Sequence, residues 1–139
     1  MLKQVLGRIE IRAPGQGLYL IYDAVAGWLL EQDIRSGLLT ILCRHTSASL
    51  LIQENAAPAA RRDLEAYFAR IAPESGVYEH DDEGPDDMPA HLRSALTQSQ
   101  LSIPIDNGRV LLGRWQGIYL FEHRREPLVR ELALHLVGE

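Results

Sequence analysis

The stretch from Leu101 to Gly113 (LSIPIDNGRVLLG) does most to decide the fold, because it has the pattern of a β-hairpin. Two runs with strand character, 101–105 and 109–113, flank Asp106-Asn107-Gly108. Asn and Gly accept the positive φ angles that a tight two-residue turn requires. The sequence therefore predicts two antiparallel strands here, followed almost at once by a third over Trp115–Glu122.

Working outward from the hairpin, the apolar periodicity predicts both strands and helices. Further strands are expected at 2–12, 18–22, 38–44 and 50–53. Helical spacing predicts a helix over 57–72, with Asn55 as its N-cap, and a shorter one from Asp87 to about Gln98 with Leu92, Ala95 and Leu96 as its buried stripe. Asp23 is expected to cap another helix that runs to about Ser36, with Gly37 as its left-handed stop.

The C-terminal segment fits two structures. Leu128, Leu132 and Leu136 have helical spacing after Pro127, whereas residues 132–137 alternate as in a strand. Intrinsic propensity slightly favours the helix. Strands and helices mixed without a regular βαβ repeat indicate an α+β fold, a mainly antiparallel sheet sandwich with helices packed on the sheet.

Length and composition bound the class of protein. The 139 residues, 46% of them hydrophobic, predict one soluble domain over 1–139 with its own core. The single cysteine, Cys43, excludes a disulfide framework and is expected to be a core residue. The longest nearly apolar stretch, Leu18–Leu30, is shorter than the ~20 residues of a membrane-spanning helix. With no signal-peptide pattern, we expect a cytoplasmic protein with no membrane partner.

Charge is unevenly distributed along the chain. The net charge of −5 argues against a nucleic-acid binder. Six acidic residues and no Lys or Arg lie between Glu79 and Asp87, so acids and bases nearly balance elsewhere. Such a run usually belongs to a solvated loop. Here His80 lies within it and His91 just after it, which leaves a binding role open.

Three histidines stand where metal ligands commonly occur. His45 follows a strand, His91 lies in the first turns of a short helix, and His123 ends another strand. No two histidines have the i, i+4 spacing of a helical zinc motif, so any site must be assembled from separate elements. Ordinary hydrogen-bonded roles remain the alternative for each.

Other polar residues near these histidines suggest chemistry as well. The segment 45–49 (HTSAS) fits an anion cradle beside a metal-binding or proton-transferring imidazole, a turn satisfied by its own hydroxyls, or, less well, a serine nucleophile. Asp86 and Asp87 near His91 form a pair suited to Mg²⁺ or Zn²⁺, although helix capping explains Asp87. Arg124 and Arg125 could meet a phosphate or lie in solvent.

Several motifs, in the same order along the chain, resemble the YjbQ-like family. They are His45–Leu50, Glu54–Ala56, Tyr78–Asp81, Asp86–His91, Ile103–Ile105, Gly113, Trp115–Ile118 and Glu122–Arg124. The resemblance runs from about Gly17 to Glu139. Members are small proteins described as secondary thiamine-phosphate synthases.

The resemblance implies an α+β sandwich-like domain, a homotrimer and a divalent metal held by histidines in a cleft that involves neighbouring subunits. It favours a C-terminal strand over 130–137, against propensity. Carried over residue by residue, it assigns the following roles: metal ligands His45, His91 and His123; catalytic residues Asp86, Asp87, His80 and Glu54; substrate contacts Thr46, Ser47, Ser49, Asn55, Trp115 and Arg124.

The implied activity is a transferase that condenses an aminopyrimidine-methyl diphosphate with a thiazole phosphate and releases pyrophosphate. Zn²⁺ is the expected ion, with Mg²⁺ or Mn²⁺ as alternatives. Two other hypotheses fit the same residues: a metal-dependent hydrolase of a small phosphorylated or carbonyl compound, and a non-catalytic trimeric protein that binds a metal or small ligand. Two departures from the family pattern are Arg114, where Thr is usual, and Glu126-Pro127-Leu128, where a more basic or glycine-rich stretch is common.

Overall fold

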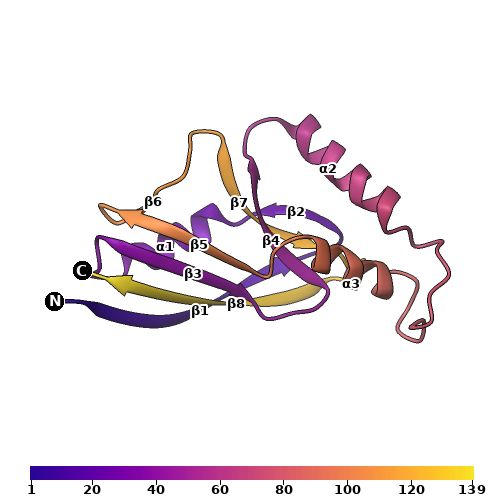
Figure 1. The fold of residues 1–139 in the computed structure, drawn as a ribbon, viewed down its shortest axis with the longest axis horizontal. Helices are drawn as coiled ribbons and strands as arrows, with labels where there is room; N and C mark the ends of the chain where they lie inside the picture. The colour runs from indigo at the N-terminus through magenta and orange to yellow at the C-terminus, as the bar shows by residue number, and fades with distance from the viewer.

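A computed structural model describes all 139 residues and shows two antiparallel sheets with three helices (Figure 1). In chain order the elements are β1 (Lys3–Ala13), β2 (Gly17–Leu20), α1 (Tyr22–Leu30), β3 (Gly37–Cys43), β4 (Ala48–Glu54), α2 (Pro58–Ile71), α3 (Asp87–Leu96), β5 (Gln100–Asp106), β6 (Arg109–Val110), β7 (Gln116–Glu122) and β8 (Leu128–Gly138). The larger sheet has the order β1-β8-β3-β5-β6 and the smaller one β2-β7-β4. The predicted α+β class is confirmed.

The C-terminal segment is a strand inside the larger sheet. β8 pairs with β1 on one side, with Lys3 opposite Gly138, and with β3 on the other, with Leu39 opposite Leu136. Alternate residues of β8 are buried, which gives a period of two. The helix that propensity favoured is therefore wrong, because pairing on both sides outweighs a weak intrinsic preference.

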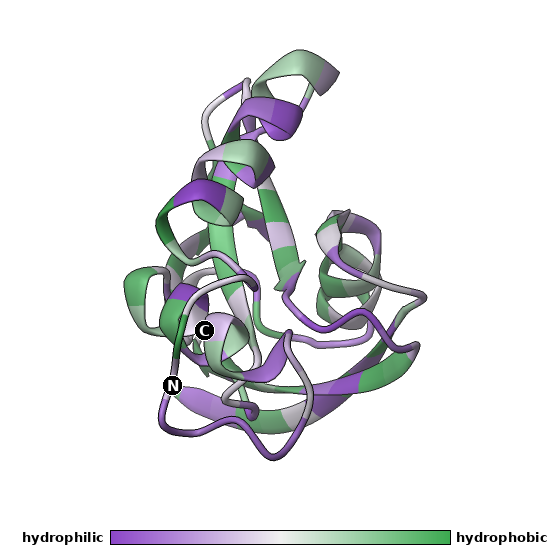
Figure 2. Ribbon diagram, turned by 90° about the vertical axis from the view of Figure 1, so that its right-hand side faces the viewer, coloured by the Kyte–Doolittle hydropathy of each residue, from purple (hydrophilic) through white to green (hydrophobic).

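Both sheets contribute to one hydrophobic core. Leu39, Ile41 and Leu134 come from the larger sheet, and Leu50 and Leu120 from the smaller one; each is fully buried. Cys43 belongs to the same cluster, as predicted. Green and purple segments alternate along the strands in Figure 2, as expected for strands that bury one face.

The Asn-Gly hairpin is confirmed. Asn107 has a φ of 53° and Gly108 a φ of 77°, the positive values that the turn needs. The returning strand β6 is shorter than predicted, because pairing ends after Ile105–Val110 and Asp106–Arg109.

The first helix differs from the prediction at both ends. α1 ends at Leu30 rather than near Ser36, and Asp23 lies inside its first turn, with no side-chain cap. Gly37 begins β3 instead of stopping a helix. A Cβ atom on Gly37 would lie 2.0 Å from the Val137 carbonyl oxygen, so glycine is needed here for close approach of two strands.

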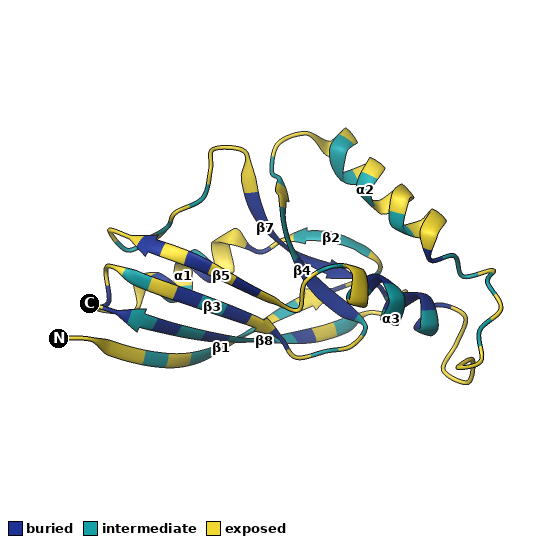
Figure 3. Cartoon of the chain, viewed as in Figure 1, coloured by how far each residue is buried: buried dark blue, intermediate teal, exposed yellow.

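The other two helices are confirmed in position, but their caps and buried faces were predicted wrongly. Asn55 does not cap α2; its amide donates to the Arg114 and Gln116 carbonyls. The buried residues of α3 are Asp87, Pro89, Ala90 and Arg93, whereas Leu96 is 61% exposed. α2 has no fully buried residue and is largely yellow and teal in Figure 3. No helix is long and apolar enough to cross a membrane.

Candidate functional site

Four side chains form a cluster of potential metal ligands at the start of α3. The loop before the helix supplies His80 and Glu83, and the helix supplies Asp87 and His91. One donor atom from each lies within 4.8 Å of the others. Asp87 and His91 share one face of α3 because they are four residues apart. This set is called the α3 cluster below.

The Asp87 carboxylate lies at the centre of the α3 cluster. Its Oδ2 atom is 3.0 Å from His80 Nε2 and 3.3 Å from His91 Nε2. His80 Nε2 is also 3.0 Å from Glu83 Oε2. Asp87 is buried and His91 half-buried, whereas His80 and Glu83 are exposed. The cluster therefore has a buried base and an open side.

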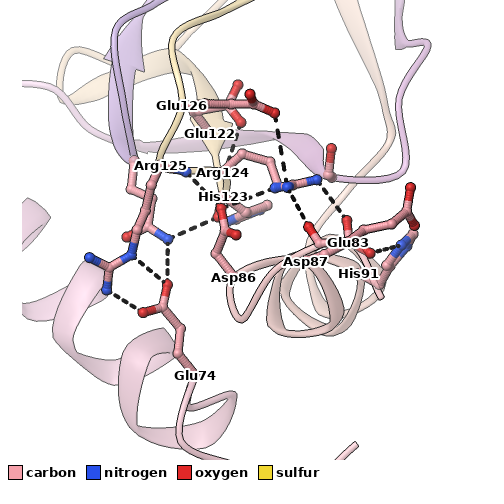
Figure 4. Close-up of polar contacts among 12 residues, drawn as sticks. Glu74, Glu83, Asp86, Asp87, His91, Glu122, His123, Arg124, Arg125 and Glu126 are labelled. Carbon is pink, nitrogen blue, oxygen red and sulfur yellow. Dashed lines mark hydrogen bonds and ion pairs between the residues drawn. The ribbon is translucent and has the colours of Figure 1, made fainter. Parts of the chain in front are cut away.

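Arg124, from the loop after β7, fixes the two aspartates (Figure 4). Its Nη1 donates to Asp87 Oδ1 at 2.8 Å and its Nε to Asp86 Oδ2 at 3.0 Å. Nη2 donates to the Glu83 carbonyl at 2.9 Å. Because Arg124 holds Oδ1 of Asp87, Oδ2 is left facing the two imidazoles. Arg124 was predicted to contact substrate; in this chain its guanidinium is bound to the acidic loop and α3.

The ionisation of the cluster follows from these contacts. Burial opposes the charged form of His80, but hydrogen bonds to Asp87 and Glu83 outweigh it and raise its pKa. Burial likewise opposes ionisation of Asp86, yet the Arg125 N–H and the Arg124 guanidinium lower its pKa. These contacts favour a proton on His80 Nε2, between the carboxylates of Asp87 and Glu83.

The α3 cluster fits a divalent cation. Two imidazoles and two carboxylates are donors that Zn²⁺ and Mn²⁺ accept. Donors on one ion at ~2.1 Å must lie within about 4.2 Å of each other, so a small rotation of exposed His80 or Glu83 would close the set. Arg124 on the far oxygen of Asp87 is the kind of outer contact that orients a ligating carboxylate.

A second polar region, around His123 at the end of β7, is closed to solvent. His123 Nε2 is 2.9 Å from Ser49 Oγ, and Thr97 Oγ1 lies 2.5 Å from the same oxygen. His123 and Ser49 are both fully buried. Burial, with the nearby charges of Arg93 and Arg130, lowers the pKa of His123 to about 3, so this imidazole is neutral. Its Nδ1 atom has no hydrogen-bond partner.

Next to His123, an ion pair supports the 45–49 segment. Arg130 Nη2 lies 2.5 Å from Glu122 Oε1, and both residues are buried. The same Nη2 donates to the Ser47 carbonyl and hydroxyl at 3.1 and 2.9 Å. The segment is thus bound to β7 and β8 through side chains outside it, and its serine hydroxyls contact other side chains instead of the backbone groups that the turn interpretation expected.

The remaining predicted site residues lie apart from the α3 cluster. His45 Nε2 accepts the Glu131 N–H at 2.9 Å, and burial followed by the charge of Arg130 lowers its pKa. Thr46 is exposed. The Glu54 carboxylate accepts the Ala56 N–H at 3.0 Å. Trp115 is 57% exposed, with the Arg114 guanidinium 4.9 Å from its ring.

Of the three predicted metal histidines, a single chain brings only His91 into a group of donors. His80 and Asp87, which the family resemblance pointed to as catalytic, stand beside it. Glu83 was missed as a site residue. The sequence spacing contained a signal for it: Glu83 lies three residues after His80, just as Asp87 lies four residues before His91, so each histidine has an acid nearby in the chain.

The fold and the α3 cluster together define a small α+β protein with a candidate metal centre at the start of one helix. A model of the family "UPF0047 protein YjbQ-like" matches residues 7–139. The chain belongs to this UPF0047/YjbQ-like family.

Named relatives agree with this membership. The UPF0047 protein sll1880 of Synechocystis is 48% identical over 94% of this chain and 90% of that protein. The UPF0047 protein YjbQ of Escherichia coli O157:H7 is 41% identical over 94% and 96%. A conserved hypothetical protein from Thermus thermophilus has a similar crystal structure, with a TM-score of 0.83 and 34% identity over 94% and 98%. A YbjQ-like protein of unknown function from Sulfolobus solfataricus shares the fold, with a TM-score of 0.91 at 21% identity over 100% of both chains.

Proposed function

We propose that this protein is a metal-dependent enzyme that acts on a small phosphorylated substrate at the α3 cluster. The observation that carries the proposal is the cluster itself, four nitrogen and oxygen donors within 4.8 Å with a buried base and an open side. Catalytic metal sites keep such an open position for water or substrate. A cavity of about 440 Å³ lies beside His80, which lines it together with Tyr78 and Met88 among others.

The reaction that family resemblance favours is the condensation of an aminopyrimidine-methyl diphosphate with a thiazole phosphate, with release of pyrophosphate. A divalent ion, Zn²⁺ first and Mg²⁺ or Mn²⁺ as alternatives, would neutralise charge on the departing diphosphate. His80 and Asp87 would hold that ion or move a proton beside it. Asp86 would act through Arg124, which it anchors.

The experiment that tests the metal centre is a metal analysis of chelator-free protein by mass spectrometry. Wild type is expected to carry about one divalent ion per chain, and His80→Ala and His91→Ala to lose it. His45→Ala and His123→Asn provide the matched comparison. Retention of metal in those two variants would assign the site to the α3 cluster alone; loss in both would assign it to the predicted His45, His91 and His123 set. Wild type that neither carries nor binds an ion would overturn the proposal.

The activity test separates three functions that use the same site. Metal-loaded protein is incubated with both organic substrates, with each alone, and with neither, and thiamine phosphate and pyrophosphate are measured. Product formed only with both substrates supports the transferase. Turnover of one substrate in water alone supports the hydrolase, in which a bound metal ion would activate water and His80, or Glu54 if a neighbouring subunit brings it to the site, would accept the proton. Tight binding without any product supports the metal or small-ligand binding protein.

We propose also that the chain assembles as a homotrimer, with sites near subunit boundaries where Thr46, Ser47, Asn55 and Trp115 could reach substrate. One feature that supports assembly is the uncovered face of the larger sheet, which exposes Leu6, Leu38 and Leu42 at 69%, 42% and 43%. A mass close to three chains by light scattering is expected, and a monomer would rule the assembly out.

A further inference from the structure

Arg93, on α3, is a buried cation with no ionic partner. The residue is only 8% exposed. No carboxylate oxygen lies within 4.0 Å of the Arg93 guanidinium nitrogens, the limit for an ion pair. The Nη2 atom of Arg93 donates a hydrogen bond to the Ala72 carbonyl oxygen at 2.8 Å. Its Nε–H is buried without any partner. Buried charges in proteins are normally paired, so this guanidinium is an exception that needs an explanation.

Neighbouring arginines show what a satisfied guanidinium looks like in this chain. Arg125 is exposed and still pairs with the Glu74 carboxylate. Arg130 is buried and pairs with Glu122. Arg93 is buried as Arg130 is, but it has no carboxylate partner, and burial lowers its pKa. The Glu74 carboxylate, whose charge acts on Arg93, is already engaged by Arg125 and by the Gln16 amide.

Arg93 lines a cavity large enough for a small molecule. The cavity measures about 390 Å³ and lies between α2, β2 and the end of β7. Phe68 and Phe121 form an apolar wall, their rings edge to face at 5.4 Å. Gly17 and the Gln16 amide lie at the same cavity. Three carboxylates also line the cavity: Glu74 pairs with Arg125, Glu122 pairs with Arg130, and the Glu65 side chain is exposed to solvent.

A purely structural role does not account for these features. A neutral donor would satisfy the Ala72 carbonyl equally well, without an unpaired charge or an orphaned N–H. An oxyanion in the cavity would supply the missing ionic partner, because a guanidinium presents its N–H groups as a fork that matches phosphate or carboxylate oxygens.

We propose that the cavity between α2 and β7 is a binding site for the oxyanion group of a small molecule, a phosphate or carboxylate, with Arg93 as its main ligand and the phenylalanines against its organic part. The site uses none of the α3 cluster donors. It therefore stands or falls separately from the proposed metal chemistry.

The test is a calorimetric titration of chelator-treated, metal-free protein. Inorganic phosphate is the ligand in one arm and acetate in the other. Wild type is expected to bind at least one of the two saturably; the tighter probe identifies the class of oxyanion. Arg93→Gln is expected to weaken binding at least about tenfold, because a charge-assisted fork is lost. Arg62→Gln removes an exposed charge from α2 and is expected to leave affinity unchanged.

A second measurement keeps the test decisive if Arg93→Gln does not fold. The Nε–H resonance of Arg93 in the wild-type protein is expected to shift with the same midpoint as the calorimetric titration. Absence of saturable binding by both probes, equal binding by Arg93→Gln, or an unmoved Nε–H resonance would each overturn the assignment.

Discussion

Two polar regions of this protein contain the same kinds of residue and differ in access to water. The α3 cluster has two histidines and two acids on an open side of the molecule. The β7 end has His123, Glu122 and Arg130, all buried. In the first region the side chains contact one another through atoms that an ion could bind; in the second they bind one another and the 45–49 segment. Residue type alone therefore does not separate a candidate site from a structural network.

The largest expected effect is on the buried ion pair. Glu122→Ala leaves the Arg130 charge buried and unpaired, so we expect the free energy of unfolding to fall by about 3–5 kcal/mol in urea titrations. The matched control is Glu131→Ala, whose partner Arg44 is at the surface, and a change of about 0–1 kcal/mol is expected there. Equal effects in the two variants would remove the distinction between the regions.

The pH dependence of stability tests the neutral state of His123. Its pKa is about 3 in the folded protein against an unfolded value of 6.5, so the unfolded chain takes up the proton first. The stability from neutral His123 is fully present above about pH 6.5 and is lost at about 1.4 kcal/mol per pH unit as the pH falls toward 3.

Urea titrations between pH 7 and pH 4 measure this slope. His123→Asn is expected to flatten it, while replacement of His135, which pairs with Gln4 at the surface, is expected to leave it unchanged. A slope equal in wild type and His123→Asn would show that His123 is protonated in the native state.

Arg124 connects the two regions, because it begins beside His123 and ends on Asp87. Arg124→Gln should weaken metal binding by about 10–100-fold, the usual effect of losing an outer-sphere contact to a ligand. Competition titrations with a chelating dye measure it. Arg125→Gln is the control, since Arg125 binds Glu74 instead of the cluster. Affinity unchanged in Arg124→Gln would mean that Asp87 needs no such support.

Local sequence signals predicted most of the fold. The Asn-Gly turn and the alternation of β1 act over a few residues, and both were read correctly. The C-terminal strand and the end of α1 could not be read in this way. β8 exists because it pairs with two strands that are distant in sequence, β1 and β3, and Gly37 is required by its contact with Val137.

The site shows the same division. An acidic run with histidines beside it pointed to His80, Asp87 and His91, and the structure brings these three together. The burial of Ser49 and His123 could not be predicted from the sequence, because only the packed structure shows that both are fully buried. Arg93 was missed for the opposite reason: the pattern placed Leu92 and Leu96 on the buried face, whereas α3 buries Arg93.

The smallest effect concerns a proton on the α3 cluster. Because Asp87 and Glu83 raise the pKa of His80, its imidazolium stabilises the metal-free fold at low pH, and this contribution is lost as the pH rises through the raised pKa. Nitrogen-detected NMR of metal-free protein should show His80 titrating above the ordinary histidine value and His123 remaining neutral. Asp87→Asn should lower the His80 midpoint, and Glu10→Gln, on the distant strand β1, should not. A His80 midpoint at or below the ordinary value would mean that the carboxylates do not share its proton. In that case the cluster would lack the linkage by which a bound metal ion displaces a proton from its ligands.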